Sequence, residues 1–112
     1  MDFVVNVYDM TKRLPDVERY GLTAQLRRAA VSVPCNVSEG HQLGGKSYLR
    51  FVSIALGSLA EASTQIEIAY RLNYINQSVF DTITRKAARL RQILHGLRRA
   101  LRARAAVSEP GT

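Results

Sequence analysis

The sequence is poor in several residue types that carry covalent or membrane functions: among 112 residues it has one cysteine, three prolines and no tryptophan. A single cysteine cannot form an intrachain disulfide, which favours a reducing compartment. The longest uncharged runs, 29–38 and 51–60, are shorter than the ~18 apolar residues of a membrane span. The N-terminus also lacks the basic and apolar regions of a secretory signal. We therefore expect a cytoplasmic protein without membrane contact.

Residues for metal or nucleophilic chemistry are equally scarce. Neither His41 nor His95 has a glutamate three residues earlier, as the paired motifs of di-iron bundles require. Cys35 follows a proline within a predicted helix, with no sign of a base that would activate it. Gly44 and Gly45 end a helix instead of joining a strand to one, so they do not form a phosphate-binding loop. The sequence predicts no metal, no cofactor and no enzymatic activity.

Acidic residues are missing mainly from the C-terminal third. Residues 1–80 contain eight Lys/Arg and seven Asp/Glu, whereas residues 81–112 contain eight and two, within a net charge of +7. A basic excess of this kind suggests an anionic partner, of which nucleic acid is the commonest.

Apolar residues recur at spacings of three and four in every segment, and no segment alternates as a strand does. The pattern predicts helices over about 2–14, 22–43, 46–73 and from Ser78 onward, with Ser78 and Asp81 as a capping box. Short connections imply antiparallel neighbours, so we expect an all-α, up-down-up-down four-helix bundle. One domain would cover residues 1–104, followed by a flexible tail over 105–112.

Pro34 lies inside the second predicted helix. Proline lacks the N–H that would bond the carbonyl of Ala30, so a kink near residues 30–34 is expected. The alternative is two shorter helices divided at Pro34. In either case Gly44-Gly45 should end the segment, since positive φ costs glycine little.

The third predicted helix has a heptad seam from Leu49 to Tyr70, with Ser63 as its one short polar residue. Beside the seam, Ala55, Ala62 and Ala69 form a second line that we call the alanine ridge. Because so few charges lie on this helix, we expect several of its faces to be buried. Subunits of a homo-oligomer could pack through the alanine ridge. Alternatively, the ridge faces the second helix within one subunit.

Two segments carry a resemblance to a known family: Tyr20–Gly40, YGLTAQLRRAAVSVPCNVSEG, and Phe51–Glu61, FVSIALGSLAE. They closely resemble the signature of bacterial four-helix-bundle proteins first named for reading frames in intervening sequences of 23S ribosomal RNA genes. The resemblance covers about residues 3–101. It implies a bundle assembled as a ring, typically a pentamer, with mostly unassigned biochemical roles. In a related branch, the accessory proteins of diversity-generating retroelements, a basic pentameric barrel binds a reverse transcriptase and its RNA.

The basic fourth helix supplies the candidate nucleic-acid-binding residues. Lys/Arg rows on a rigid helix neutralise phosphates and release counterions, which gives salt-sensitive binding without sequence preference. The helix lacks an exposed aromatic row for base stacking, so sequence readout of single strands is not expected. A plain solvated surface and an acidic protein partner use the same residues as alternatives. The candidates fall into two rows that flank the core seam: Arg91, Arg98 and Arg102 with His95 in one row, and Arg85, Arg89 and Arg99 in the other.

A second polar set follows the second and third predicted helices beside their apolar faces, and it coincides with motif residues of the resemblance, to which the family gives no catalytic role. We expect it to form a structural network or a subunit interface, because polar groups at such contacts must be paired. Glu39 and Glu61 could pair with Arg27 or Arg28 and fix the register of helices or subunits. A catalytic or ligand site is the alternative. The set comprises Gln25, Arg27, Arg28, Asn36, Glu39 and Glu61.

Together these features predict a non-catalytic, oligomeric binding or adaptor protein that contacts RNA or a nucleoprotein through its C-terminal helix. The alternative is a structural or protein-binding ring with no nucleic-acid role.

Overall fold

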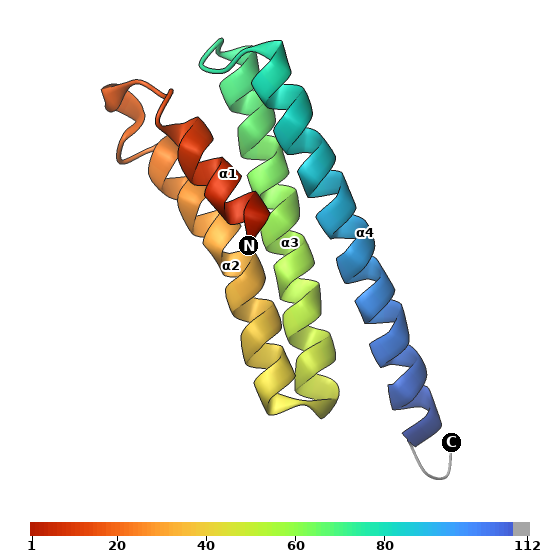
Figure 1. Ribbon diagram of the computed structural model, residues 1–112. Helices are drawn as coiled ribbons and strands as arrows, with labels where there is room; N and C mark the ends of the chain where they lie inside the picture. The colour runs from red at the N-terminus through yellow and green to blue at the C-terminus, as the bar shows by residue number, and fades with distance from the viewer. Residues whose placement is uncertain (109–112) are drawn as a thin grey trace.

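The computed structural model describes residues 1–108, and within that range every regular element is helical. The elements are α1 (Asp2–Thr11), the 3-10 helix η1 (Asp16–Glu18), α2 (Leu22–Leu43), α3 (Gly45–Arg71) and α4 (Gln77–Ser108). Consecutive helices run in opposite directions, as Figure 1 shows. The predicted all-α, up-down-up-down bundle is therefore confirmed.

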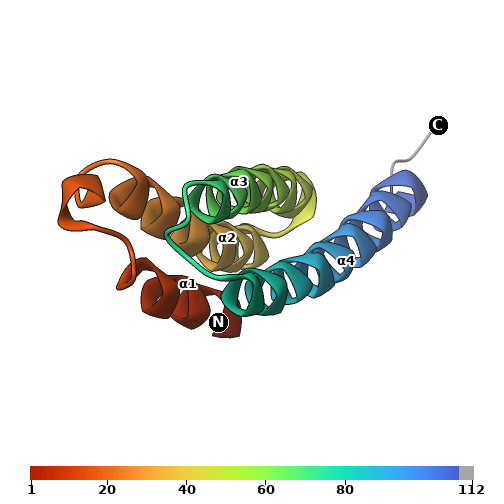
Figure 2. The same ribbon diagram turned by 90° about the horizontal axis from the view of Figure 1, so that it is seen from above.

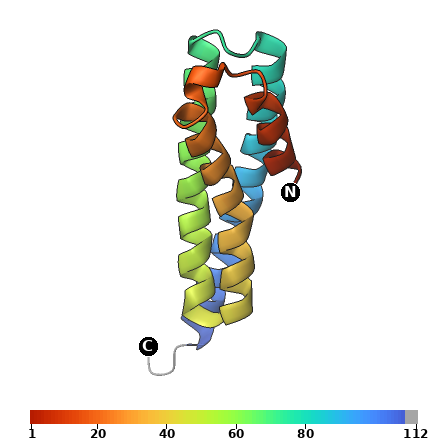
Figure 3. The same ribbon diagram turned by 90° about the vertical axis from the view of Figure 1, so that its left-hand side faces the viewer.

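The helices differ greatly in length, which leaves the two ends of the bundle unequally covered. The molecule extends 56 Å along its long axis, but α1 has only 10 residues, and its N-terminus lies near the middle of α2 (Figure 3). At the other side, α4 leans away from α2 and α3 toward its C-terminal end (Figure 2). The half of the molecule nearest the α2–α3 turn is consequently built from three helices.

The ends of α1 and α3 fall two or three residues before the predicted boundaries. After Thr11 the chain tightens into i to i+3 hydrogen bonds, the last from the Leu14 N–H to the Thr11 carbonyl at 3.1 Å, before Pro15 ends the turn. Leu14 remains buried. Asn73 closes α3 at φ 63°, where the Tyr74 N–H donates to the Ala69 carbonyl at 2.9 Å.

Helix α2 continues through Pro34 over 22 residues, so the alternative of two helices divided there is wrong. The predicted kink remains a prediction. Gly44 and Gly45 have φ of 69° and 55°, which confirms the expected glycine stop. Shortly before it, a Cβ on Gly40 would lie 2.7 Å from the Phe51 Cβ, so a glycine is needed where α2 and α3 cross closely.

The alanine ridge is buried inside the single chain. Ala55, Ala62 and Ala69 are all 0% exposed and belong to the main apolar core. Ser58 lies on the same helix face, three residues after Ala55 and four before Ala62, and contacts Ser32 of α2. The ridge therefore faces α2, as the alternative proposed. The expectation that subunits pack through it is wrong, because small residues serve here to bring α2 and α3 together.

Helix α4 begins and ends differently from the prediction. Its N-cap is Asn76, whose Oδ1 accepts a hydrogen bond from the Val79 N–H at 2.9 Å, so the predicted capping box of Ser78 and Asp81 is wrong. Asn competes well for this position because its side chain reaches the third N–H of the helix. At the other end the helix reaches Ser108, beyond the predicted domain limit at residue 104. The rest of the predicted tail, 109–112, lies outside the described residues.

Candidate nucleic-acid interface on α4

The six candidate arginines all lie on α4, but the structure distributes them over two sides of the helix. Arg89 borders a cavity with Met1 and with Asp2 and Phe3 of α1. Arg91 faces the opposite way, where its Nη2 donates to the Ser63 Oγ of α3 at 3.3 Å. Four of the six are exposed, and Arg91 and Arg98 are half-buried. Both sides of the core seam therefore present positive charge.

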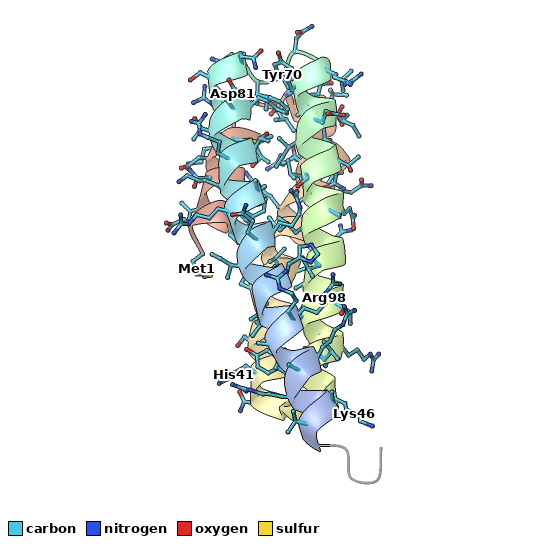
Figure 4. The ribbon with its side chains drawn as sticks, turned by 90° about the vertical axis from the view of Figure 1, so that its right-hand side faces the viewer. Met1, His41, Lys46, Tyr70, Asp81 and Arg98 are labelled. Atoms are coloured by element: carbon cyan, nitrogen blue, oxygen red, sulfur yellow. The ribbon has the colours of Figure 1, made fainter. Side chains whose placement is uncertain are left out.

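Arg98 is fixed within α4 itself. Its Nη2 lies 2.9 Å from the His95 Nδ1, and Figure 4 shows its side chain on the α3 side of α4. A guanidinium has no acceptor atom, so the arginine donates and His95 accepts at Nδ1. The neutral ring must then carry its proton on Nε2.

An open cavity of about 410 Å³ lies on this side of α4. We call it the α4 pocket; it is lined by Ala88, Arg91, Gln92, His95 and Arg99. Its volume falls in the usual range for small-ligand sites, about 300–1,000 Å³. Every polar side chain in the lining can donate a hydrogen bond, and the lining contains no carboxylate. The pocket is thus suited to an anion.

The candidate arginines have no carboxylate partner among residues 1–108. The ion pairs within that range include Lys12–Asp9 and Arg71–Glu67, both on exposed side chains of other helices. Asp81 is the one acidic residue of α4, and its Oδ1 accepts from the Gln77 amide at 2.9 Å. None of the six arginines therefore forms an ion pair within the described chain, and Asp2 is the acidic residue that borders the same cavity as Arg89.

Three members of the polar set on α2 and α3, Arg27, Asn36 and Glu61, make hydrogen bonds within the chain. Ser32 and Ser58 share a 2.8 Å hydrogen bond between α2 and α3, and the Asn36 amide donates to the Ser32 carbonyl and hydroxyl, each at 2.8 Å. Arg27 instead joins α2 to α1: its Nε donates to the Thr11 Oγ1 at 2.8 Å, and its guanidinium lies 4.6 Å from the Tyr8 ring centre.

The predicted pairing of glutamates with Arg27 or Arg28 is wrong within one chain. Glu61 accepts from the Gln65 amide at 3.3 Å, four residues further along α3. Arg27 is engaged by Thr11, while Gln25, Arg28 and Glu39 are exposed. Gln65 is 7% exposed, and its Oε1 has no hydrogen-bond partner among the described residues. The part of the prediction that concerns register between subunits remains a prediction.

Comparison of the sequence with known protein families gives a match. The family model for 23S rRNA-intervening sequence proteins matches residues 1–96. The chain belongs to this family. The match includes α1, α2, α3 and most of α4, including the α4 pocket as far as His95.

A solved structure also resembles this protein. It is a protein of unknown function from the S23 ribosomal protein family of Bacteroides thetaiotaomicron, with a TM-score of 0.79 and 20% sequence identity. The alignment covers 87% of this chain and 92% of that one. At this identity the likeness establishes the fold alone. No curated protein matches the sequence.

Several residues that contact the candidate site residues were not predicted. Ser63 contacts Arg91, and a signal existed because it is the one short polar residue in the apolar seam of α3. Thr11 and Tyr8 hold Arg27, but nothing in the local pattern of α1 indicates a partner 16 residues away. Such pairings depend on how the helices are rotated against each other.

The remaining candidates for metal or membrane contact give no site in the described part of the chain. His41 packs edge-on against Tyr48 at a ring distance of 5.5 Å, and His95 is held by Arg98. Across residues 1–108, no three His, Cys, Asp or Glu side chains gather closely enough to hold a metal ion. None of the helices in this range combines the length and apolar character needed to cross a bilayer.

Proposed function

We propose that this protein is a non-catalytic, oligomeric adaptor that binds RNA or a nucleoprotein through α4. The observation that supports the proposal best is the charge of this helix: between Arg85 and Arg104 it has eight Lys/Arg and no Asp/Glu. Six of these residues lack a carboxylate partner within residues 1–108. A rigid helix with such an array binds phosphates by releasing counterions. A reverse transcriptase with its RNA is one nucleoprotein of the kind that the family resemblance implies.

Filter binding of single-stranded RNA and duplex DNA over a salt series tests the proposal. We expect the logarithm of the affinity to fall linearly with the logarithm of salt concentration, by about 0.7 for each phosphate contact on a single strand. Alanine at Arg91, Arg98 and Arg102 should weaken binding at every salt concentration. Absence of binding at low ionic strength, or binding that the triple variant leaves unchanged, would remove the proposal.

Self-association is the second part of the proposal, with a pentameric ring as the assembly that the resemblance implies. Since the alanine ridge is covered by α2, the assembly must use another surface. An open cavity of about 760 Å³ lies where α2 continues past the N-terminus of α1, and we call it the α2 groove. Its lining is mostly apolar, and two of its members, Met1 and Leu43, are 82% and 60% exposed. A second copy would cover this surface from water.

A structural or protein-binding ring without a nucleic-acid role is the competing function, and the α2 groove favours it as much as it favours the adaptor. The two proposed functions make different predictions for variants of α4. A purely structural ring would assemble and ignore RNA, and charge-removing variants of α4 would leave its properties unchanged.

A further inference from the structure

We propose that the α4 pocket is a site for the phosphodiester backbone of single-stranded RNA, and that it binds RNA more tightly than the other basic surfaces of the same helix do. The inference rests on the proposed RNA-binding function and makes it specific. The general array of arginines predicts attraction wherever charge is exposed. The structure singles out one stretch where several donors converge, and two of them, Arg91 and His95, are held by neighbouring side chains.

The first argument is the fixed position of Arg91. Its guanidinium reaches across to α3 and donates to the Ser63 Oγ at 3.3 Å, using one of five N–H donors. The remaining donors stay available at the edge of the α4 pocket. A half-buried, tethered arginine loses less conformational entropy on binding than a freely rotating one. The exposed Arg85 and Arg89 have no such contact in the described chain.

The second argument is the orientation of His95. Because Nδ1 accepts from Arg98, the ring presents an Nε2–H donor, and rotation of the ring would break the 2.9 Å contact. Arg98 thus positions the histidine, and it adds positive charge beside the α4 pocket.

The third argument is the spacing of the donors along α4. Arg91, His95 and Arg99 are four residues apart, which places them on one side of the helix at intervals of about 6 Å along its axis. Gln92 adds an amide donor between them. The short side chain of Ala88 lets a ligand come close to the helix backbone. A chain of linked anions can meet these donors in succession, whereas an isolated anion can use only one or two.

The lining of the α4 pocket contains no carboxylate, and this favours a negatively charged ligand. Near the pocket, α3 supplies Ser63, and the lining belongs entirely to uncharged or donor-bearing residues of α4. A cationic ligand would find no carboxylate to pair with, whereas the oxygens of a phosphodiester, which only accept hydrogen bonds, would meet these donors. No Phe, Tyr or Trp side chain lines the pocket, so base identity should have little influence on binding.

The test compares two double variants that remove the same charge from the same helix. Arg91→Gln with Arg99→Gln empties the α4 pocket of its arginines, and Arg85→Gln with Arg89→Gln is the matched control outside it. The probe is a fluorescein-labelled oligouridine RNA, whose anisotropy is followed over a salt series. Circular dichroism melts verify that all proteins are folded.

We expect the pocket variant to lose about 25-fold in affinity at 0.1 M salt and about 1.4 in salt slope, as the loss of two phosphate contacts predicts. The control variant should lose less than about fivefold. His95→Phe, which keeps a ring but lacks the Nε2–H, should weaken binding as well. Equal losses of RNA affinity in both double variants would overturn the proposal that the α4 pocket is the binding site, while the proposed RNA-binding function would stand. No binding by the unaltered protein would overturn both.

Discussion

Glu18 connects parts of the chain that lie far apart in the sequence. One carboxylate oxygen accepts the Leu22 N–H at 3.3 Å at the start of α2, and the other accepts the Tyr74 hydroxyl at 3.0 Å. The contact with Tyr74 joins η1 to the turn between α3 and α4. A hydrogen bond from a phenol to a carboxylate favours the neutral phenol, so this contact, followed by burial and the negative charge of Glu18, raises the pKa of Tyr74 above its ordinary 10.0.

A consequence at the residue scale concerns alkaline pH. The stabilisation from a raised tyrosine pKa is complete below the unfolded value near 10 and declines as pH rises through the folded value. Tyr74→Phe should therefore destabilise the protein at pH 8, and its deficit relative to the unaltered protein should shrink above pH 10. Urea unfolding of both proteins at pH 8 and pH 11 measures the two differences. A deficit that is constant or grows with pH would contradict the assignment.

Ser63 gives a second residue-scale prediction, because it positions Arg91 without touching the proposed ligand. Ser63→Ala should lower RNA affinity a few-fold while the salt slope stays the same, since no charge is lost. Ser63→Thr retains the hydroxyl and should restore affinity. Anisotropy titrations at three salt concentrations separate the two quantities. If the threonine variant binds as poorly as the alanine variant, the hydrogen bond to Arg91 is not the cause.

At the scale of whole helices, apolar spacing was sufficient to predict four helices and their antiparallel order, because the buried faces of α1 to α4 repeat every three or four residues. The bounds of α2 were predicted from its glycine stop and agree with the structure. Spacing alone could not say which neighbour covers each face. Ala55, Ala62 and Ala69 were predicted to contact either another subunit or the second helix, and only the rotation of α3 toward α2 shows that they belong to the core of one chain.

The buried alanine ridge gives a prediction about packing. Ala62→Leu inserts a larger side chain where α2 and α3 meet and should cost about 1–3 kcal/mol of unfolding free energy. Ala60→Leu, on the exposed side of the same helix, is the matched control and should change stability by less than about 0.5 kcal/mol. Chemical denaturation provides both values. Similar stability of the two variants would mean that the ridge is not packed as described.

The N-terminus of α4 gives another prediction at this scale. Asn76→Ala removes the acceptor for the Val79 N–H and should destabilise the protein by about 1 kcal/mol. Ser78→Ala, two residues later, tests the capping box that the sequence suggested and should be nearly neutral. Thermal melts of the two variants decide between the caps. A larger loss for the serine variant would restore the original prediction.

At the scale of the whole molecule, unequal helix lengths produce the surfaces on which the proposed function depends. The short α1 leaves the α2 groove open, and the divergence of α4 from α3 leaves room for the α4 pocket (Figures 1 and 2). Helix lengths could be read from the sequence, but the open surfaces could not, since they depend on the tilt of α4. Helical spacing predicted the basic residues of the interface and their two rows beside the core seam, but it put Arg99 in the row of Arg85 and Arg89, whereas Arg99 borders the α4 pocket with Arg91 and His95.

Assembly is predicted at this scale. Light scattering at micromolar concentration should give a mass that is a multiple of the 12.5 kDa chain, with five copies as the proposed number. Leu43→Glu places a charge in the α2 groove and should shift the protein toward monomer with its helix content retained. Val17→Glu is the control, because Val17 is 84% exposed on η1. A monomeric unaltered protein, or equal effects of both variants, would argue against the groove as the subunit contact.

The most direct measurement of the central claim, that α4 is the RNA-binding element, is cross-linking of the assembled protein to 4-thiouridine RNA, followed by peptic digestion and mass spectrometry. The account predicts cross-linked peptides from residues 85–104, concentrated around Arg91 to Arg99, and their loss at high salt. Cross-links confined to α2 and α3, or none at low salt, would contradict it.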